Sequence, residues 1–82
     1  MLDAVPIALD EIYVPAKRRR TRDDARVEAL ALDILENGLK NPIHVRRDEE
    51  RYVLVEGLHR LEAVRALGED TVEALVVSAR RH

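Results

Sequence analysis

Apolar and polar residues recur along the chain with spacings that predict alternating strands and helices. In residues 5–14 the apolar positions alternate with polar ones, but the alternation changes phase between Leu9 and Ile12. This pattern predicts a strand with a bend or bulge. Pro6 and Pro15 bracket the segment, which is typical of an edge strand or of strand ends.

Two segments have the spacing of an amphipathic helix. The first starts at Asp23 and Asp24, whose carboxylates suit the free amides of a helix N-terminus, and ends at Asn37-Gly38. The second covers residues 58–67, before Gly68. The apolar face of the first helix follows the i, i+3, i+4, i+7, i+8 pattern and consists of Val27, Leu30, Ala31, Ile34 and Leu35.

The remaining segments predict a hairpin and a final strand. Residues 42–47 and 52–56 form the hairpin strands, with a polar turn at residues 48–51. A β-branched run at residues 71–78 predicts the last strand, followed by a polar tail at residues 80–82. The order β-α-β-β-α-β indicates the α+β class, with a ferredoxin-like split βαβ as an alternative architecture.

Length and composition limit the classes of protein. The chain has 82 residues, and we expect one domain spanning residues 1–82. It has no cysteine, which excludes disulfides, thiolate catalysis and cysteine-based zinc sites. Tyr13 and Tyr52 are its only aromatic residues, too few for stacking on single-stranded nucleic acid. No apolar run reaches the ~18 residues of a membrane span, so we expect a cytoplasmic protein without membrane contact.

The charges are unevenly distributed. The formal net charge is −2, which argues against a dedicated nucleic-acid-binding protein. Yet five of the six residues 17–22 are Lys or Arg. This run has three interpretations: a loop that closes over phosphates, a weak and nonspecific contact with DNA, or a solvated loop.

The most informative segment joins the hairpin to the second helix. Gly57 ends a strand, and His59 and Arg60 fall in the first turn of the helix that follows. The first amides of a helix have no internal partner, and the helix dipole favours negative charge there. A glycine lets a ligand approach the backbone, while Arg and His add cations. The combination predicts a phosphate-binding turn; a solvated His and Arg at a helix end are the alternative.

This turn resembles that of the ParB/sulfiredoxin superfamily. ParB-type domains carry Gly-Glu-Arg-Arg there and sulfiredoxins carry Gly-Cys-His-Arg, whereas this chain has Gly-Leu-His-Arg at residues 57–60. Upstream, the Gly-Leu, Pro-Ile and Val-Arg pairs at residues 38–39, 42–43 and 45–46 follow the ParB pattern. The resemblance covers residues 5–77 and implies a ParB/sulfiredoxin-like fold.

The resemblance also implies a pocket for CTP or ATP. By position, the phosphates would contact Gly57, His59 and Arg60, and the nucleoside side would be lined by Gly38, Leu39, Asn41 and Pro42. The basic loop would close over the phosphates through Arg18, Arg19 or Arg20, and the sequence does not distinguish among them.

Three carboxylates are candidates for chemistry at this pocket. Glu56 and Glu62 flank the turn, and either would suit Mg²⁺ held together with phosphates; a salt bridge to an arginine is the alternative. Glu36, near the end of the first helix, is a third candidate acid. No His, Asp and Glu cluster has the spacing of a metal site. The sequence does not identify which of the three carboxylates, if any, is catalytic.

The chain departs from both branches of the superfamily at Leu58. A leucine stands where sulfiredoxins have their cysteine, which excludes reduction of a sulfinic acid. The same leucine replaces the acidic residue of the ParB motif, which argues against CTP hydrolysis and leaves at most a weak NTPase activity open. We expect no room in 82 residues for the helix-turn-helix domain and dimerisation tail of full ParB proteins.

Three functions remain open on this basis. The first is a nucleotide-binding module, regulatory or accessory in chromosome partition or transcription, that acts through a DNA-binding partner protein. The second is a small enzyme of the superfamily, an ATP-dependent phosphotransferase or a nuclease. The third is a degenerate, nucleotide-free protein-interaction domain. A homodimer would suit the small aliphatic core.

Overall fold

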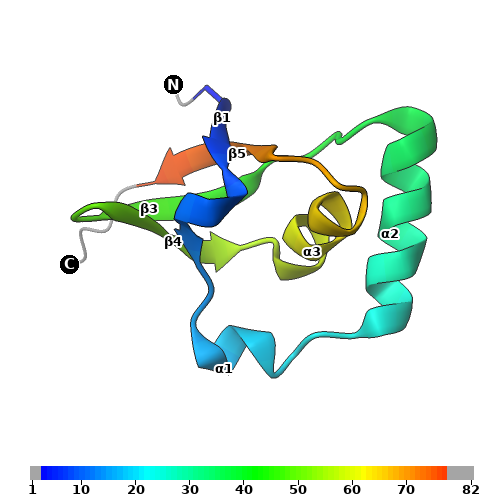
Figure 1. Ribbon diagram of the computed structural model, residues 1–82, viewed down its shortest axis with the longest axis horizontal. Coiled ribbons are helices and arrows are strands. Elements are labelled where there is room, and N and C mark those ends of the chain that lie inside the picture. Colours follow the sequence, from blue (N-terminus) through cyan, green and yellow to red (C-terminus); the bar gives the residue numbers. More distant parts are fainter. Residues whose placement is uncertain (1–2, 78–82) are drawn as a thin grey trace.

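In the computed structural model, which describes residues 3–77, five strands form one mixed sheet in the order β1-β5-β3-β4-β2 (Figure 1). Their bounds are β1 Val5–Ala8, β2 Ile12–Tyr13, β3 Ile43–Asp48, β4 Arg51–Glu56 and β5 Thr71–Val77. The β1–β5 and β3–β4 pairs are antiparallel, whereas β3–β5 and β2–β4 are parallel. The α+β prediction is confirmed, but the parallel pairs exclude the ferredoxin-like alternative, whose sheet is antiparallel throughout.

The predicted first strand is instead two short strands on opposite edges of the sheet. A 3₁₀ helix, η1 (Leu9–Glu11), separates β1 beside β5 from β2 beside β4. Side chains three residues apart eclipse in a 3₁₀ turn, so Leu9 and Ile12 both enter the core, with 6% and 7% exposure. The Leu9 amide donates to the Asp70 carbonyl at 2.9 Å, which fixes the turn. The phase change in the sequence therefore marks a change of sheet edge.

The hairpin and the last strand lie close to their predicted positions. β3 and β4 are joined by a tight turn in which Glu49 adopts a φ of 55°. Ile43 and Val45 on β3 are fully buried. The predicted strand end at Ser78 and the polar tail at residues 80–82 lie outside the described residues.

The helices stack outward from the sheet. α3 (Leu58–Ala66) packs between the sheet and α2 (Asp24–Asn37), while α1 (Ala16–Arg19) forms a single turn within the predicted basic loop (Figure 1). Asp23 caps α2 by accepting a hydrogen bond from the Ala25 amide at 3.0 Å. Within the described residues, no helix is long and apolar enough to cross a membrane.

One residue of the predicted apolar face of α2 is misplaced. Leu35 is 69% exposed, whereas Val27 is buried and Ile34 packs against the core. The reason is that α2 packs against α3 and not against the broad face of the sheet. The buried face of α2 is therefore narrower than the apolar face that its sequence predicts.

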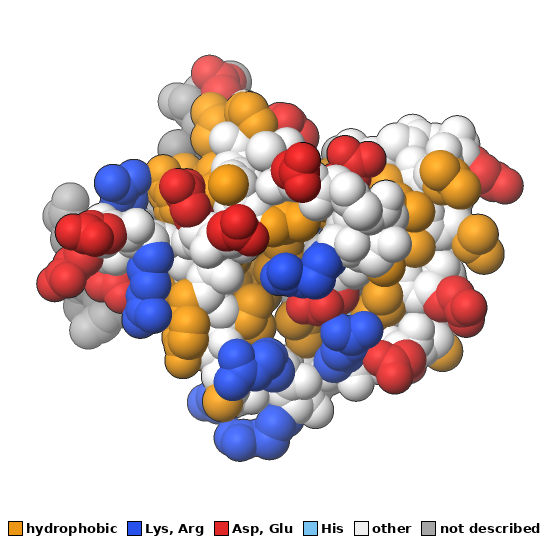
Figure 2. Space-filling view, viewed as in Figure 1, with side chains coloured by type: hydrophobic (Ala, Val, Ile, Leu, Met, Phe, Trp, Pro, Cys, Tyr) orange, Lys and Arg blue, Asp and Glu red, His pale blue; other side chains and the backbone are white. Residues whose placement is uncertain are grey.

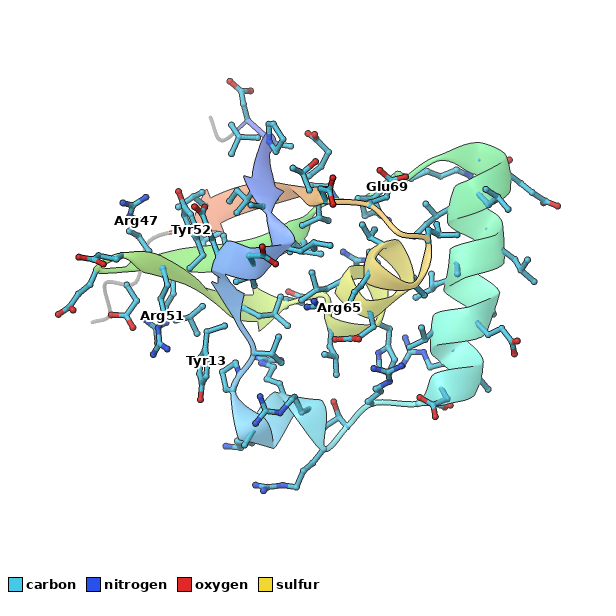
Figure 3. All side chains as sticks on the ribbon, in the orientation of Figure 1. Tyr13, Arg47, Arg51, Tyr52, Arg65 and Glu69 are labelled. Atoms are coloured by element: carbon cyan, nitrogen blue, oxygen red, sulfur yellow. The ribbon has the colours of Figure 1, made fainter. Side chains whose placement is uncertain are left out.

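The core is aliphatic and lies between α3 and one face of the sheet. Its most completely buried side chains are Ile43, Val45, Leu54 and Leu61. The two tyrosines lie against arginines: the Arg51 guanidinium carbon is 4.1 Å from the Tyr13 ring centroid, and that of Arg47 is 5.0 Å from the ring of Tyr52 (Figure 3). Both aromatic pairs lie on the strands and leave the region around Gly57 to aliphatic and charged side chains.

Candidate functional site

The strand-to-helix turn at Gly57 requires glycine. Its φ of 108° and ψ of 32° lie in the left-handed region. A Cβ at this position would lie 2.9 Å from Cγ2 of Ile43, a fully buried residue of β3. Gly57 is the N-cap of α3, and its carbonyl accepts from the Leu61 amide at 2.9 Å. The amides of residues 58–60 consequently have no partner within the helix.

A hollow of about 220 Å³ lies beside this turn. We call it the phosphate-side hollow, after the sequence prediction. Three parts of the chain line it: the region of α1, the first half of α2 and the turn itself. Its residues are Arg18, Thr21, Arg26, Leu30, Glu56, Gly57, Leu58, His59 and Arg60.

A second, smaller hollow of about 90 Å³ adjoins it, and we call it the nucleoside-side hollow. Its lining includes three of the four residues predicted for that side, namely Gly38, Leu39 and Asn41, together with Leu30, Asp33, Ile34, Lys40 and Arg60. Leu30 and Arg60 line both hollows. Pro42, the fourth predicted residue, contributes its carbonyl, which accepts from Arg60 Nη1 at 2.9 Å. This hydrogen bond fixes the guanidinium of Arg60, a residue that lines both hollows.

His59 connects the turn to the second helix. Its Nε2 accepts a hydrogen bond from the backbone amide of Asp23 at 3.0 Å. A ring nitrogen that accepts carries no proton, so in this arrangement the ring is neutral with its proton on Nδ1. The bond therefore ties the start of α3 to the N-cap of α2 and leaves His59 with one donor.

The basic segment places its arginines in different surroundings. Figure 2 shows Lys and Arg side chains gathered over α1. Among the three predicted arginines, Arg18 lines the phosphate-side hollow. Arg19 instead donates from Nη1 to the Val14 carbonyl at 2.9 Å, and Arg20 is exposed and lines neither hollow.

The three candidate carboxylates also differ. Glu56 lines the phosphate-side hollow with a side chain that is 66% exposed, and its Oε1 lies 3.7 Å from His44 Nδ1. Glu36 is exposed on α2 and lines neither hollow. In the described residues, no group of three His, Cys, Asp or Glu could hold a metal ion.

Glu62 is engaged in ion pairs. Its Oε1 lies 2.7 Å from Arg22 Nη1 and 3.7 Å from Arg65 Nε, and its side chain is only 13% exposed. Arg22 also donates to Asp24 at 2.8 Å, and this hydrogen bond raises the pKa of the Arg22 guanidinium above its usual value. The salt-bridge alternative from the sequence therefore describes Glu62, which joins α3 to the start of α2.

The predicted site residues did not include four residues of the phosphate-side hollow: Thr21, Arg26, Leu30 and Leu58. Thr21 donates from Oγ1 to the Arg18 carbonyl at 2.7 Å and so helps to shape the end of α1. Arg26 precedes Leu30 by four residues and therefore shares its helix face, a signal that the sequence does contain.

Comparison with known proteins gives a consistent family match. A family model described as the ParB N-terminal domain matches residues 3–82. The nucleoid occlusion protein of Bacillus cereus (strain AH187) is 42% identical over 59 residues, which make up 71% of this chain and 20% of that protein. The chain thus spans about a fifth of the length of the curated relatives that it matches.

Two solved structures are similar over nearly the whole chain. Sulfiredoxin from Arabidopsis thaliana superposes with a TM-score of 0.84 at 31% identity, covering 94% of this chain and 86% of that one. The C-terminally truncated chromosome-partitioning protein ParB from Caulobacter crescentus, complexed with CTP-γ-S, gives a TM-score of 0.81 at 27% identity. That match covers 95% of this chain and 46% of the ParB chain.

Proposed function

The chain belongs to the ParB N-terminal domain family, and on that premise we propose that it binds a nucleotide, CTP or ATP, in the two adjoining hollows. The observation that carries the proposal is the position of Arg60. Arg60 lines both hollows, and its guanidinium donates a hydrogen bond to the Pro42 carbonyl. A fixed, always charged guanidinium suits phosphate oxygens next to a nucleoside.

The remaining parts of the proposed site follow from local chemistry. Phosphates would accept hydrogen bonds from the free amides that follow Gly57, where the helix dipole also favours negative charge. The nucleoside would lie against the segment from Gly38 to Asn41. His59 would donate from Nδ1, or exchange its bond with the Asp23 amide for one with the ligand.

The carboxylates support binding more than hydrolysis. Leu58, which is 7% exposed, stands in the motif where ParB-type domains have an acid. Glu56 is the one candidate carboxylate in the lining of the phosphate-side hollow, and it fits Mg²⁺ held by one protein carboxylate together with phosphate oxygens. Bound Mg²⁺ would neutralise part of the phosphate charge at that position.

We further propose that nucleotide binding serves a regulatory or accessory role in chromosome partition, exerted through a DNA-binding partner protein. Support comes from the relatives: one is a nucleoid occlusion protein, and another is a chromosome-partitioning protein in complex with a CTP analogue. In each case the match covers less than half of the relative.

The test is isothermal titration calorimetry against CTP, ATP and GTP with Mg²⁺. We expect saturable heat with CTP or ATP and no release of phosphate in a parallel assay. Arg60→Ala should abolish the binding heat, while Arg51→Ala should retain it because Arg51 lies at the opposite end of β4 from Gly57. Absence of binding to all three nucleotides would refute the proposal. Unchanged affinity in Arg60→Ala, with a folded circular dichroism spectrum, would show that the site is misplaced.

A further inference from the structure

Arg26 lines the phosphate-side hollow without a charged partner. Among the described residues, no carboxylate lies within 4.0 Å of its guanidinium, and the same holds for Arg18. Among the described arginines, Arg22, Arg51 and Arg65 are paired with carboxylates, and none of these three lines the hollow. An unpaired guanidinium that borders a hollow is available for bidentate hydrogen bonds to phosphate oxygens.

The two unpaired arginines lie on one side of Arg60. Arg60 lines both hollows, whereas Arg18 and Arg26 line the phosphate-side hollow and not the nucleoside-side hollow. A nucleotide with its base and sugar in the nucleoside-side hollow would thus pass Arg60 first. Its phosphate chain would then extend toward Arg18 and Arg26, so that these two residues meet the phosphate farthest from the sugar.

The charge of the hollow matches a long phosphate chain. Three permanent cations, Arg18, Arg26 and Arg60, face a single carboxylate, that of Glu56. His59 adds no charge while its Nε2 accepts from the Asp23 amide. A monophosphate would occupy the Arg60 end and leave the other two cations unsatisfied, whereas a triphosphate would reach all three.

We propose that Arg26 is a specificity-determining residue that, together with Arg18, selects a nucleoside triphosphate over the corresponding monophosphate. The inference rests on the proposed nucleotide site and adds to it a residue from outside the Gly57–Arg60 turn. Arg26 belongs to α2, so this selection would also depend on how α2 is held against α3.

The experiment is a titration of Arg26→Gln with the tri-, di- and monophosphates of the nucleoside that the wild type binds, at one salt concentration. We expect the triphosphate affinity to fall about tenfold or more, as for loss of a hydrogen bond to a charged group, and the monophosphate affinity to change less than about twofold. Arg26→Lys should give an intermediate loss, because it keeps the charge and removes the planar fork.

The matched control is Arg51→Gln, which removes the same charge on the hairpin and should leave all three affinities unchanged. Equal losses for all three phosphates in Arg26→Gln, or no loss for the triphosphate, would overturn the inference while the nucleotide site stands. If the wild type binds neither the tri-, the di- nor the monophosphate, the proposed function and the inference about Arg26 are both wrong. Circular dichroism spectra of the two Arg26 variants should match that of the wild type. An unchanged helix content shows that the substitution has not unfolded α2.

Discussion

At the scale of single residues, two features of the fold require glycine at position 57. The position needs the left-handed backbone conformation, and it needs the absence of a Cβ because Ile43 lies 2.9 Å from where that atom would be. We expect Gly57→Ala to lower the free energy of unfolding by on the order of 2–4 kcal/mol, from backbone strain and overpacking together. Urea unfolding followed by circular dichroism measures this loss.

Gly68→Ala is the matched control for that variant. Gly68 has a φ of 82°, but a Cβ there would meet nothing within 4 Å. Its substitution therefore brings the backbone strain alone, and we expect a loss of about 1 kcal/mol. Equal losses in the two variants would show that the contact with Ile43 relaxes freely and does not fix the turn.

The individual residues of the site were only partly predictable from the sequence. The turn at Gly57 has a local signature, because a glycine and two cations follow a strand directly. Arg26 has only its four-residue spacing from Leu30, and an arginine on an amphipathic helix looks like a solvated residue until the neighbouring helix is placed. Glu62 was ambiguous for a similar reason, since its partner Arg22 is 40 residues away in the chain.

At the scale of elements, the apolar pattern predicted which segments are helices or strands better than it predicted where they pack in the fold. The phase change between Leu9 and Ile12 revealed the break in the first strand, but not that β1 and β2 pair with opposite edges of the sheet. Strand pairing depends on residues far away in the chain, and β2 has only two residues, too few for an alternating pattern. The exposure of Leu35 on α2 could not be predicted for the same reason, because it depends on which distant element α2 packs against.

The start of α2 matters for the site because that helix carries Arg26. Asp23 caps it through the Ala25 amide, so we expect Asp23→Ala to lower the free energy of unfolding by about 1 kcal/mol. Glu28→Ala, at an exposed position inside the same helix, should leave stability nearly unchanged. Urea unfolding of both variants is the measurement. If the two are equally stable, the contacts with α3, and not the cap, position the start of α2.

At the scale of the whole molecule, the net charge of −2 conceals a separation of charge. Cationic side chains gather over α1 (Figure 2). The phosphate-side hollow is lined by residues from the region of α1, from α2 and from the start of α3. A ligand in the two hollows would therefore contact residues from the region of α1, from α2 and from the start of α3. Its binding should stabilise the folded state against unfolding.

We accordingly expect nucleotide to raise the midpoint of thermal unfolding. A ligand at a hundred times its dissociation constant stabilises the folded state by about 2.7 kcal/mol, which in a chain of this size corresponds to a shift on the order of 10 °C. Thermal melts followed by circular dichroism, with and without CTP or ATP and Mg²⁺, measure it. Arg60→Ala should melt without any shift, because it lacks the cation that lines both hollows. A shift of full size in that variant would mean that the nucleotide stabilises the protein from another surface.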